Sequence, residues 1–332
     1  MKNQLNALPA KLGSMQELSR SLPISWVASI AKYLVLAFAS VIGGAATANA
    51  QFLPVYDNIP ILIPLNVFSQ NPSSYGNFTE FGDGFTLAVP HSTLGTVTVV
   101  MQAWTCQNGY WNDGPGPNAC VTSAGATYAM PVTVNVYSVV TGTSFEGVAG
   151  SPAPGTLLAT ATQTFNMPYR PSSDFVHCPV AAGQSSGGYY QWYNPNTQTC
   201  QDGIDFPITF DLSRQKIALP SQVIVTFSFN TSTTGTHPYG TGNPCNSAVT
   251  GCFYDSLNMS GAANMAAYPG AVPGPIVGSV LNVSGVFARF PGSNTALCGV
   301  GTLPANTLAL DASPGCYTGN HPMIAVTAEP KL

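Results

Sequence analysis

The chain has 332 residues, a formal net charge of −4, and charged side chains at only 7% of its positions. Ordinary soluble domains carry about 25% charged residues, so Ser, Thr, Asn, Gln, Gly and Tyr must cover most of this surface. Five Lys and Arg residues follow residue 50, against twelve Asp and Glu residues. This composition argues against binding to nucleic acid or to anionic membranes. It suits neutral partners such as glycans or other proteins.

Residues 1–50 have the features of an export signal. An apolar run over residues 33–46 follows Lys32, and Ala48-Asn49-Ala50 provides a small-x-small cleavage site before Gln51. The run is shorter than the roughly 20 residues of a membrane-spanning helix, although a retained membrane anchor is the alternative. We therefore predict a cleaved signal over residues 1–50 and a single secreted domain over residues 51–332, with no membrane attachment after cleavage.

Strand patterns dominate the sequence after residue 50. Short runs rich in β-branched and aromatic residues alternate with segments rich in Gly, Pro, Asn and Ser, and no segment has a helical period. The pattern predicts an all-β fold, namely a two-sheet antiparallel sandwich of jelly-roll-like type with disulfide-pinned loops. The expected strands cover residues 85–89, 96–104, 132–140, 156–167, 208–212, 222–230, 276–290 and 323–328.

All eight cysteines follow the export signal, which is typical of disulfides formed in an oxidising compartment. Each close couple brackets a loop, so we predict pairing of nearest neighbours, although the sequence alone allows many other pairings. Paired C-x-x-C spacing is absent, and we expect neither a metal site nor a cofactor. The four couples are Cys106 and Cys120, Cys178 and Cys200, Cys245 and Cys252, and Cys298 and Cys316.

Aromatic residues in the first two of these loops are candidate binding residues, because exposed aromatic rings could form a platform for sugar rings. Burial beneath the disulfides is the alternative. The candidates are Trp111, Tyr189, Tyr190 and Trp192. On this basis we expect a non-enzymatic extracellular protein that binds glycans or a cell-surface partner.

Arg170 is a further candidate because it lies between two prolines in a chain with very few basic residues. Two interpretations are open. An ion pair with an acid such as Asp174 would fix Arg170 in place, or the guanidinium group faces a ligand.

Other functions remain open. The acids Asp202, Asp205 and Asp211 lie close together in sequence and could supply the carboxyl pair of a polysaccharide hydrolase. A structural coat component would need no ligand site at all. The side-chain oxygens of Asp255, Ser256 and Asn258 could bind calcium, or they could bind the backbone of their own turn.

Four strings occur together in a characteristic order: Tyr56-Asp57-Asn58-Ile59-Pro60, Glu80-Phe81-Gly82-Asp83, Pro168-Tyr169-Arg170-Pro171-Ser172 and Tyr254-Asp255-Ser256-Leu257-Asn258. With the loop cysteines, they resemble a group of secreted bacterial β-sandwich proteins of actinobacterial type. The resemblance implies export and a β-sandwich, and it implies no activity. Some members carry a C-terminal surface anchor, which the final residues of this chain do not match. Within the second string, Gly82 and Asp83 are expected to form a turn before the strand at residues 85–89.

Overall fold

The structure of the protein is a computed structural model, and the elements that it describes lie within Gln51–Leu332. Within the described residues the chain consists of strands, loops and one 3-10 turn, η2 (Ser213–Gln215). No helix in this part of the chain is long and apolar enough to span a membrane. The described residues are 51–61, 63, 69–70, 78–90, 92–109, 114–117, 119–179, 190–229, 257–262, 277–290, 303–312 and 320–330.

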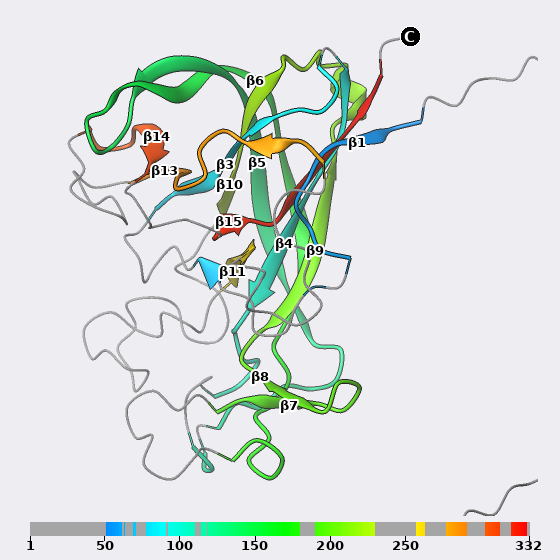
Figure 1. Cartoon of the computed structure of the whole chain (residues 1–332). Helices are drawn as coiled ribbons and strands as arrows, with labels where there is room; N and C mark the ends of the chain where they lie inside the picture. The colour runs from blue at the N-terminus through cyan, green and yellow to red at the C-terminus, as the bar shows by residue number, and fades with distance from the viewer. Residues whose placement is uncertain are drawn as a thin grey trace, which may run out of the picture. The chain divides into compact units, whose positions relative to one another are not determined.

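Two seven-stranded antiparallel sheets form a sandwich (Figure 1), which confirms the predicted fold class. In sheet A, β4 is central, with β16 and β11 on one side and β9 on the other. Its strands are β1 (Leu53–Asp57), β2 (Ser69–Gln70), β4 (Thr93–Ala103), β9 (Ile204–Asp211), β11 (Leu257–Ala262), β15 (His321–Pro322) and β16 (Ile324–Glu329).

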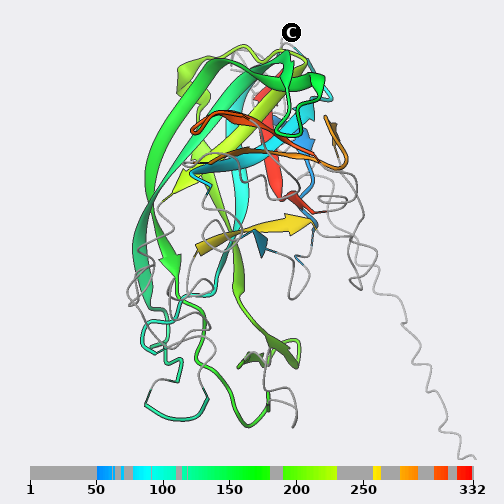
Figure 2. The same ribbon diagram turned by 90° about the vertical axis from the view of Figure 1, so that its left-hand side faces the viewer.

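Sheet B has the order β14-β13-β3-β10-β5-β6, with β12 added beside β3. The long β5–β6 hairpin runs along one margin of the sandwich (Figure 2). A separate two-stranded hairpin joins β7 (Trp192–Asn194) to β8 (Thr199–Gln201). The strands of sheet B are β3 (Glu80–Thr86), β5 (Thr127–Thr143), β6 (Ala149–Pro168), β10 (Gln222–Phe229), β12 (Ser279–Val280), β13 (Val286–Arg289) and β14 (Leu308–Asp311).

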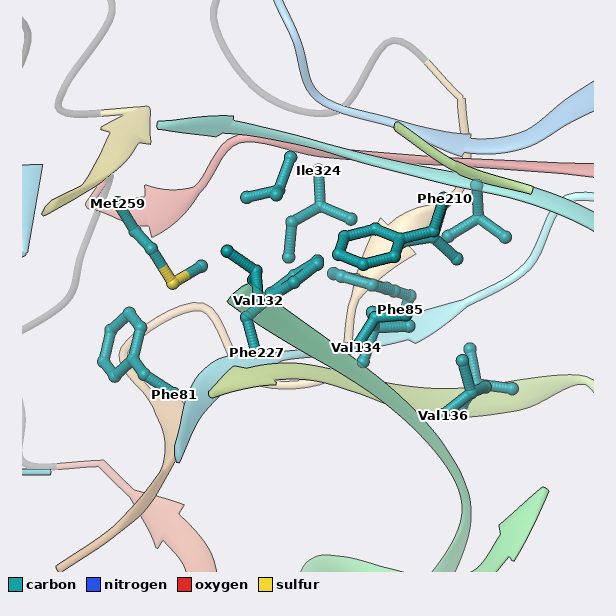
Figure 3. Close-up of a cluster of buried hydrophobic side chains, with 14 of the residues drawn as sticks. Phe81, Phe85, Val132, Val134, Val136, Phe210, Phe227, Met259 and Ile324 are labelled. Atoms are coloured by element: carbon teal, nitrogen blue, oxygen red, sulfur yellow. The ribbon is translucent and has the colours of Figure 1, made fainter. Parts of the chain in front are cut away.

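The core lies between the sheets, where alternate side chains of each strand meet (Figure 3). In sheet B, Phe227 pairs with Val134 and also with Phe81, so that all three side chains share the inner face. Ile324 and Phe210 meet them from sheet A. Burial of each large apolar side chain contributes roughly 1.5–3 kcal/mol, so this core supplies the main stabilisation of the sandwich.

The expected turn at Gly82 and Asp83 is wrong, because both residues lie inside β3. A side chain at Gly82 would place its Cβ 2.0 Å from the carbonyl oxygen of Val225, so the glycine permits close strand packing. Asp83 lies between Phe81 and Phe85 on the inward-facing side of the strand. The single strand expected over residues 276–290 is also wrong, because the chain forms β12 and β13 with a turn between them.

Asp83 joins the two sheets through His321 of β15. The Asp83 Oδ2 to His321 Nδ1 distance is 2.7 Å, and both residues are buried. His321 Nε2 lies 3.2 Å from the carbonyl oxygen of Val283, which can only accept, so Nε2 carries a proton. Burial lowers the pKa of His321, but the charge and hydrogen bond of Asp83 and the Val283 carbonyl raise it by more. The pair therefore holds a proton inside the sandwich.

The outer face of sheet B is covered where the tip of the β5–β6 hairpin curls over β14 (Figure 1). The amide of Phe145 donates to the carbonyl of Leu310 at 2.9 Å, and the Ala312 amide donates to Glu146 Oε1 at 2.8 Å. Beneath the tip lies a second apolar cluster of Ile224, Phe287, Leu308 and Leu310.

Candidate functional site

Both described disulfides lie in one group of loops, which we call the disulfide end and define as residues 104–109, 114–117, 119–126, 169–179 and 190–203. Its β7–β8 hairpin lies at the end of the sandwich away from the C-terminus (Figure 1). Cys106 bonds to Cys120 and Cys178 to Cys200, which confirms nearest-neighbour pairing for these couples. Disulfides of this kind indicate an oxidising environment. The other four cysteines lie outside the described residues.

Residues 170–174 connect the two disulfide loops. Their backbone and side chains bond to both loops, so this segment has a structural role. The bonds run from Arg170 N to Thr105 O (3.0 Å), Ser173 N to Cys120 O (3.1 Å), Asp174 N to Gln191 O (2.9 Å) and Thr122 N to Ser172 Oγ (2.9 Å).

Arg170 is fully buried at the centre of this connection. Its guanidinium group donates to the carbonyl oxygen of Tyr190 at 2.7 Å and to Ser173 Oγ at 3.4 Å. Burial raises the pKa of Asp202, while the Gln191 amide and the charge of Arg170 lower it. Arg170 is therefore near an acid, Asp202, whereas Asp174, the acid named as an example from the sequence, bonds to Val176 and His177. The buried side chain is positioned to support the loops rather than to face a ligand.

Two tryptophans pack inside the disulfide end. Trp192 is only 9% exposed and donates from Nε1 to the carbonyl oxygen of Gly203 at 2.9 Å. Trp104 packs on the Cys106–Cys120 disulfide, and a Cβ on Gly203 would lie 2.6 Å from its ring. Trp192 is therefore buried rather than part of an exposed platform, and Trp104 is the tryptophan that packs on a disulfide. Trp111 and Tyr189 lie outside the described residues.

Partly exposed rings nonetheless occur at the disulfide end, where His177 is exposed and Phe175, Tyr190 and Tyr193 are half-buried. His177 stacks on Tyr193 with ring centroids 4.6 Å apart, and Phe175 meets Tyr190 edge to face at 5.5 Å. Val176, between Phe175 and His177, is 83% exposed. We call these five residues the aromatic rim. Tyr190 alone among them is a site residue predicted from the sequence.

Asp174 fixes the turn that carries half of the rim. Its Oδ1 accepts the amides of Val176 at 3.0 Å and His177 at 2.9 Å, and its Oδ2 lies 2.7 Å from His177 Nδ1. The bonds from His177 and Val176 lower the pKa of Asp174. Because Nδ1 is engaged, the imidazole of His177 has a fixed orientation while its side chain remains 57% exposed. The spacing Asp174-x-x-His177 is the sequence signal from which this Asp174-stabilised turn could have been predicted.

The candidate hydrolase acids reach different partners. Asp205 accepts a hydrogen bond from Ser260 Oγ at 2.6 Å and one from Gln102 Nε2 at 3.4 Å, whereas Asp202 accepts one from the Gln191 amide. Burial raises the pKa of Asp205 to about 7, against the lowering effect of its two hydrogen bonds. Asp205 can therefore hold a proton near neutral pH. None of its bonded partners among the described residues is a second carboxyl group.

This pKa predicts a pH-dependent stability. The unfolded chain releases the Asp205 proton near pH 3.8, whereas the folded protein holds it until about pH 7, so the free energy of unfolding should fall between these values. Each unit of difference between the folded and unfolded pKa of Asp205 corresponds to about 1.4 kcal/mol. Because Asp205 is partly exposed, solvent reduces this contribution. We therefore expect the free energy of unfolding to fall by about 2–3 kcal/mol. Urea unfolding at pH 4 and pH 8 should show this loss, and Asp205→Asn should remove it.

Asp211→Asn is the matched control for this measurement. Asp211 is an exposed acid on the same strand, and its bonds to Ser213 lower its pKa, so it stabilises the protein as the pH rises. Its replacement should leave the Asp205 contribution in place. An Asp205→Asn variant that loses as much stability between pH 4 and pH 8 as the unchanged protein would refute the assignment.

Comparisons with models of known protein families, with curated proteins and with solved structures find no match for this chain. The described residues contain no group of three or more His, Cys, Asp or Glu side chains that could hold a metal ion. Asn258, which was considered for calcium, is buried on β11 beside Gln102 of β4. Residues 255 and 256 lie outside the described residues.

Proposed function

We propose that this is a secreted, non-enzymatic recognition protein that binds a neutral glycan through the aromatic rim. The observation that carries the proposal is the pair of ring contacts, His177 on Tyr193 and Phe175 on Tyr190, beside the exposed Val176. Two disulfides and the buried Arg170 hold the loops that present these rings. A preorganised surface loses little conformational freedom on binding.

The chemistry of the surface supports a neutral ligand. The flat apolar face of an aromatic ring can pack against the apolar face of a sugar ring. The polar group of Tyr or His can at the same time bond to a sugar hydroxyl. Only 7% of the residues of the chain are charged, so long-range attraction of an ionic partner would be weak. Proposed export of the chain through residues 1–50 would place the rim where polysaccharides and cell surfaces occur.

Tyr193→Ala is expected to weaken glycan binding at least tenfold. Loss of an aromatic residue at the centre of an interface commonly costs about 2 kcal/mol, and tenfold in affinity corresponds to about 1.4 kcal/mol. The measurement is a pull-down of the purified protein on insoluble polysaccharides and cell-wall preparations, followed by titration with the soluble form of any polysaccharide that binds. Sugar release is assayed in the same tubes.

A matched pair of valine substitutions provides the control. Val176→Ser changes the rim, whereas Val148→Ser changes an exposed valine at the tip of the β5–β6 hairpin. Weakened binding for Val176→Ser alone would support the proposal. Equal binding by Tyr193→Ala and the unchanged protein would overturn it, and sugar release would support the hydrolase alternative instead.

A further inference from the structure

Strand β6 forms the end of sheet B and, among the described strands, pairs only with β5. Its 20 residues, Ala149–Pro168, include no Asp, Glu, Lys or Arg. Natural sheets usually protect such an edge with charged residues, prolines, bulges or a covering segment, because an open edge offers unpaired backbone groups to another strand. A long uncharged end strand is therefore unusual for a protein that remains alone.

The first half of β6 does carry such protection. Pro152 and Pro154 lack amide protons, and the pairing with β5 shifts register around Tyr137. Gln215 of η2 then donates from Nε2 to the carbonyl oxygen of Thr160 at 3.0 Å. The protection by these features ends at Thr160.

No described strand pairs with the outer edge of the second half. The Thr160 carbonyl accepts its hydrogen bond from Gln215 of η2, so it points away from β5. Every second residue of a strand directs its backbone N–H and C=O groups to the same side. Those of Thr162, Thr164 and Asn166 therefore also point away from β5. The side chains of these three residues are exposed. The Thr162 hydroxyl is bonded to that of Thr133 on the neighbouring strand at 2.7 Å, which keeps it on the face of the sheet rather than over the edge.

We propose that this edge binds the same edge of a second copy of the chain, in antiparallel orientation about a two-fold axis at Thr164. In this register Thr162 pairs with the partner's Asn166, and Thr164 pairs with the partner's Thr164. The partner's Pro168, the last residue of β6, then lies opposite Thr160. The segment that pairs with the partner thus ends before Thr160. This agrees with the structure, because the Thr160 carbonyl already accepts a hydrogen bond from Gln215.

The charge of β6 favours a second copy as the occupant. When the same strand of two copies pairs, like charges on the two strands lie close together. Such pairing is therefore unfavourable for a strand that carries charged residues. β6 has no charges, whereas the end strand of sheet A on the same side, β9, carries Asp205 and Asp211 and is interrupted by Pro207. Self-pairing is isologous and closes as a dimer, so it needs no further partner.

Cysteine trapping tests the proposed register. Thr164→Cys should form an intermolecular disulfide under mild oxidation, because directly opposed residues of a hydrogen-bonded antiparallel pair have Cα atoms about 5.5 Å apart. Thr209→Cys is the matched control, since Thr209 is an exposed threonine on β9. We expect the covalent dimer on non-reducing gels for Thr164→Cys only. Equal cross-linking of both variants, or of neither, would overturn the register.

Thr164→Pro tests the interface without a cross-link. Proline is tolerated on an edge strand whose amide faces solvent, so the thermal unfolding of the variant should stay close to that of the unchanged protein. Light scattering coupled to size exclusion should show a dimer for the unchanged protein and at least tenfold weaker dimerisation for Thr164→Pro. A monomeric unchanged protein at all concentrations, or a dimer unaffected by the proline, would overturn the proposal.

Discussion

Glu80→Ala should lower the free energy of unfolding by about 3–5 kcal/mol, because several donors lose the buried carboxylate that accepts their hydrogen bonds. Glu80 is 4% exposed, and its Oε2 accepts a hydrogen bond from Arg289 Nε at 2.8 Å. Its Oε1 accepts bonds from Asn135, Tyr137 and the hydroxyl of Thr226. One carboxylate therefore joins strands β3, β5, β10 and β13 on the outer face of sheet B.

Urea unfolding at neutral pH measures this loss. Glu80→Gln should cost less, about 1.5–3 kcal/mol, because the amide oxygen still accepts hydrogen bonds but the charge opposite Arg289 is removed. Glu329→Ala, at the end of β16, is the control and should lie within about 0.5 kcal/mol of the unchanged protein. A Glu80→Ala variant as stable as this control would show that the network contributes little.

The long strands could be predicted because each one shows its buried face in its own sequence. β5 alternates Val132, Val134 and Val136 towards the core, and the observed strand extends the expected one at both ends. Strands β11 and β14 were missed. β14 has only four residues, and β11 has the sequence LNMSGA, whose Asn, Ser and Gly residues are not typical of strands. Their pairing depends on neighbours that are distant in the sequence.

Asp83 shows why local rules fail at some positions. A Gly-Asp pair is a common turn signal, yet here the glycine allows close strand packing and the acid pairs with His321 from the other sheet. No local pattern reveals a partner 238 residues away. Tertiary contacts thus overrode the turn preference.

The sequence predicted the disulfide-bracketed loops of the candidate site better than it predicted which of their side chains are exposed. The sequence identified the aromatic loops between cysteines, and these loops do form the disulfide end. Composition cannot separate a buried ring such as Trp192 from the half-buried rings of Phe175 and Tyr193, and the sequence predicted neither of these two as a site residue. Large aromatic side chains suit both a small core and a binding surface. The packing of the loops decides between the two.

Arg170→Ala should loosen the disulfide end and weaken glycan binding while the sandwich stays folded. The guanidinium group bonds to the carbonyl of Tyr190 and to Ser173, and it is near the half-buried acid Asp202. Removal of one buried charged partner typically costs about 3–5 kcal/mol. Hydrogen exchange should therefore become faster at residues 170–178 and 190–203, and remain unchanged in β4 and β10.

Arg214→Ala is the matched control, because Arg214 is an exposed arginine on η2. It should change neither hydrogen exchange nor binding. The informative result is where in the chain hydrogen exchange becomes faster. Both disulfides remain in Arg170→Ala, but they fix the loops only at their four cysteines. If exchange in the disulfide end does not change in Arg170→Ala, the disulfides alone position the rim. Faster exchange together with lost binding would instead show that recognition depends on a buried charge that never touches the ligand.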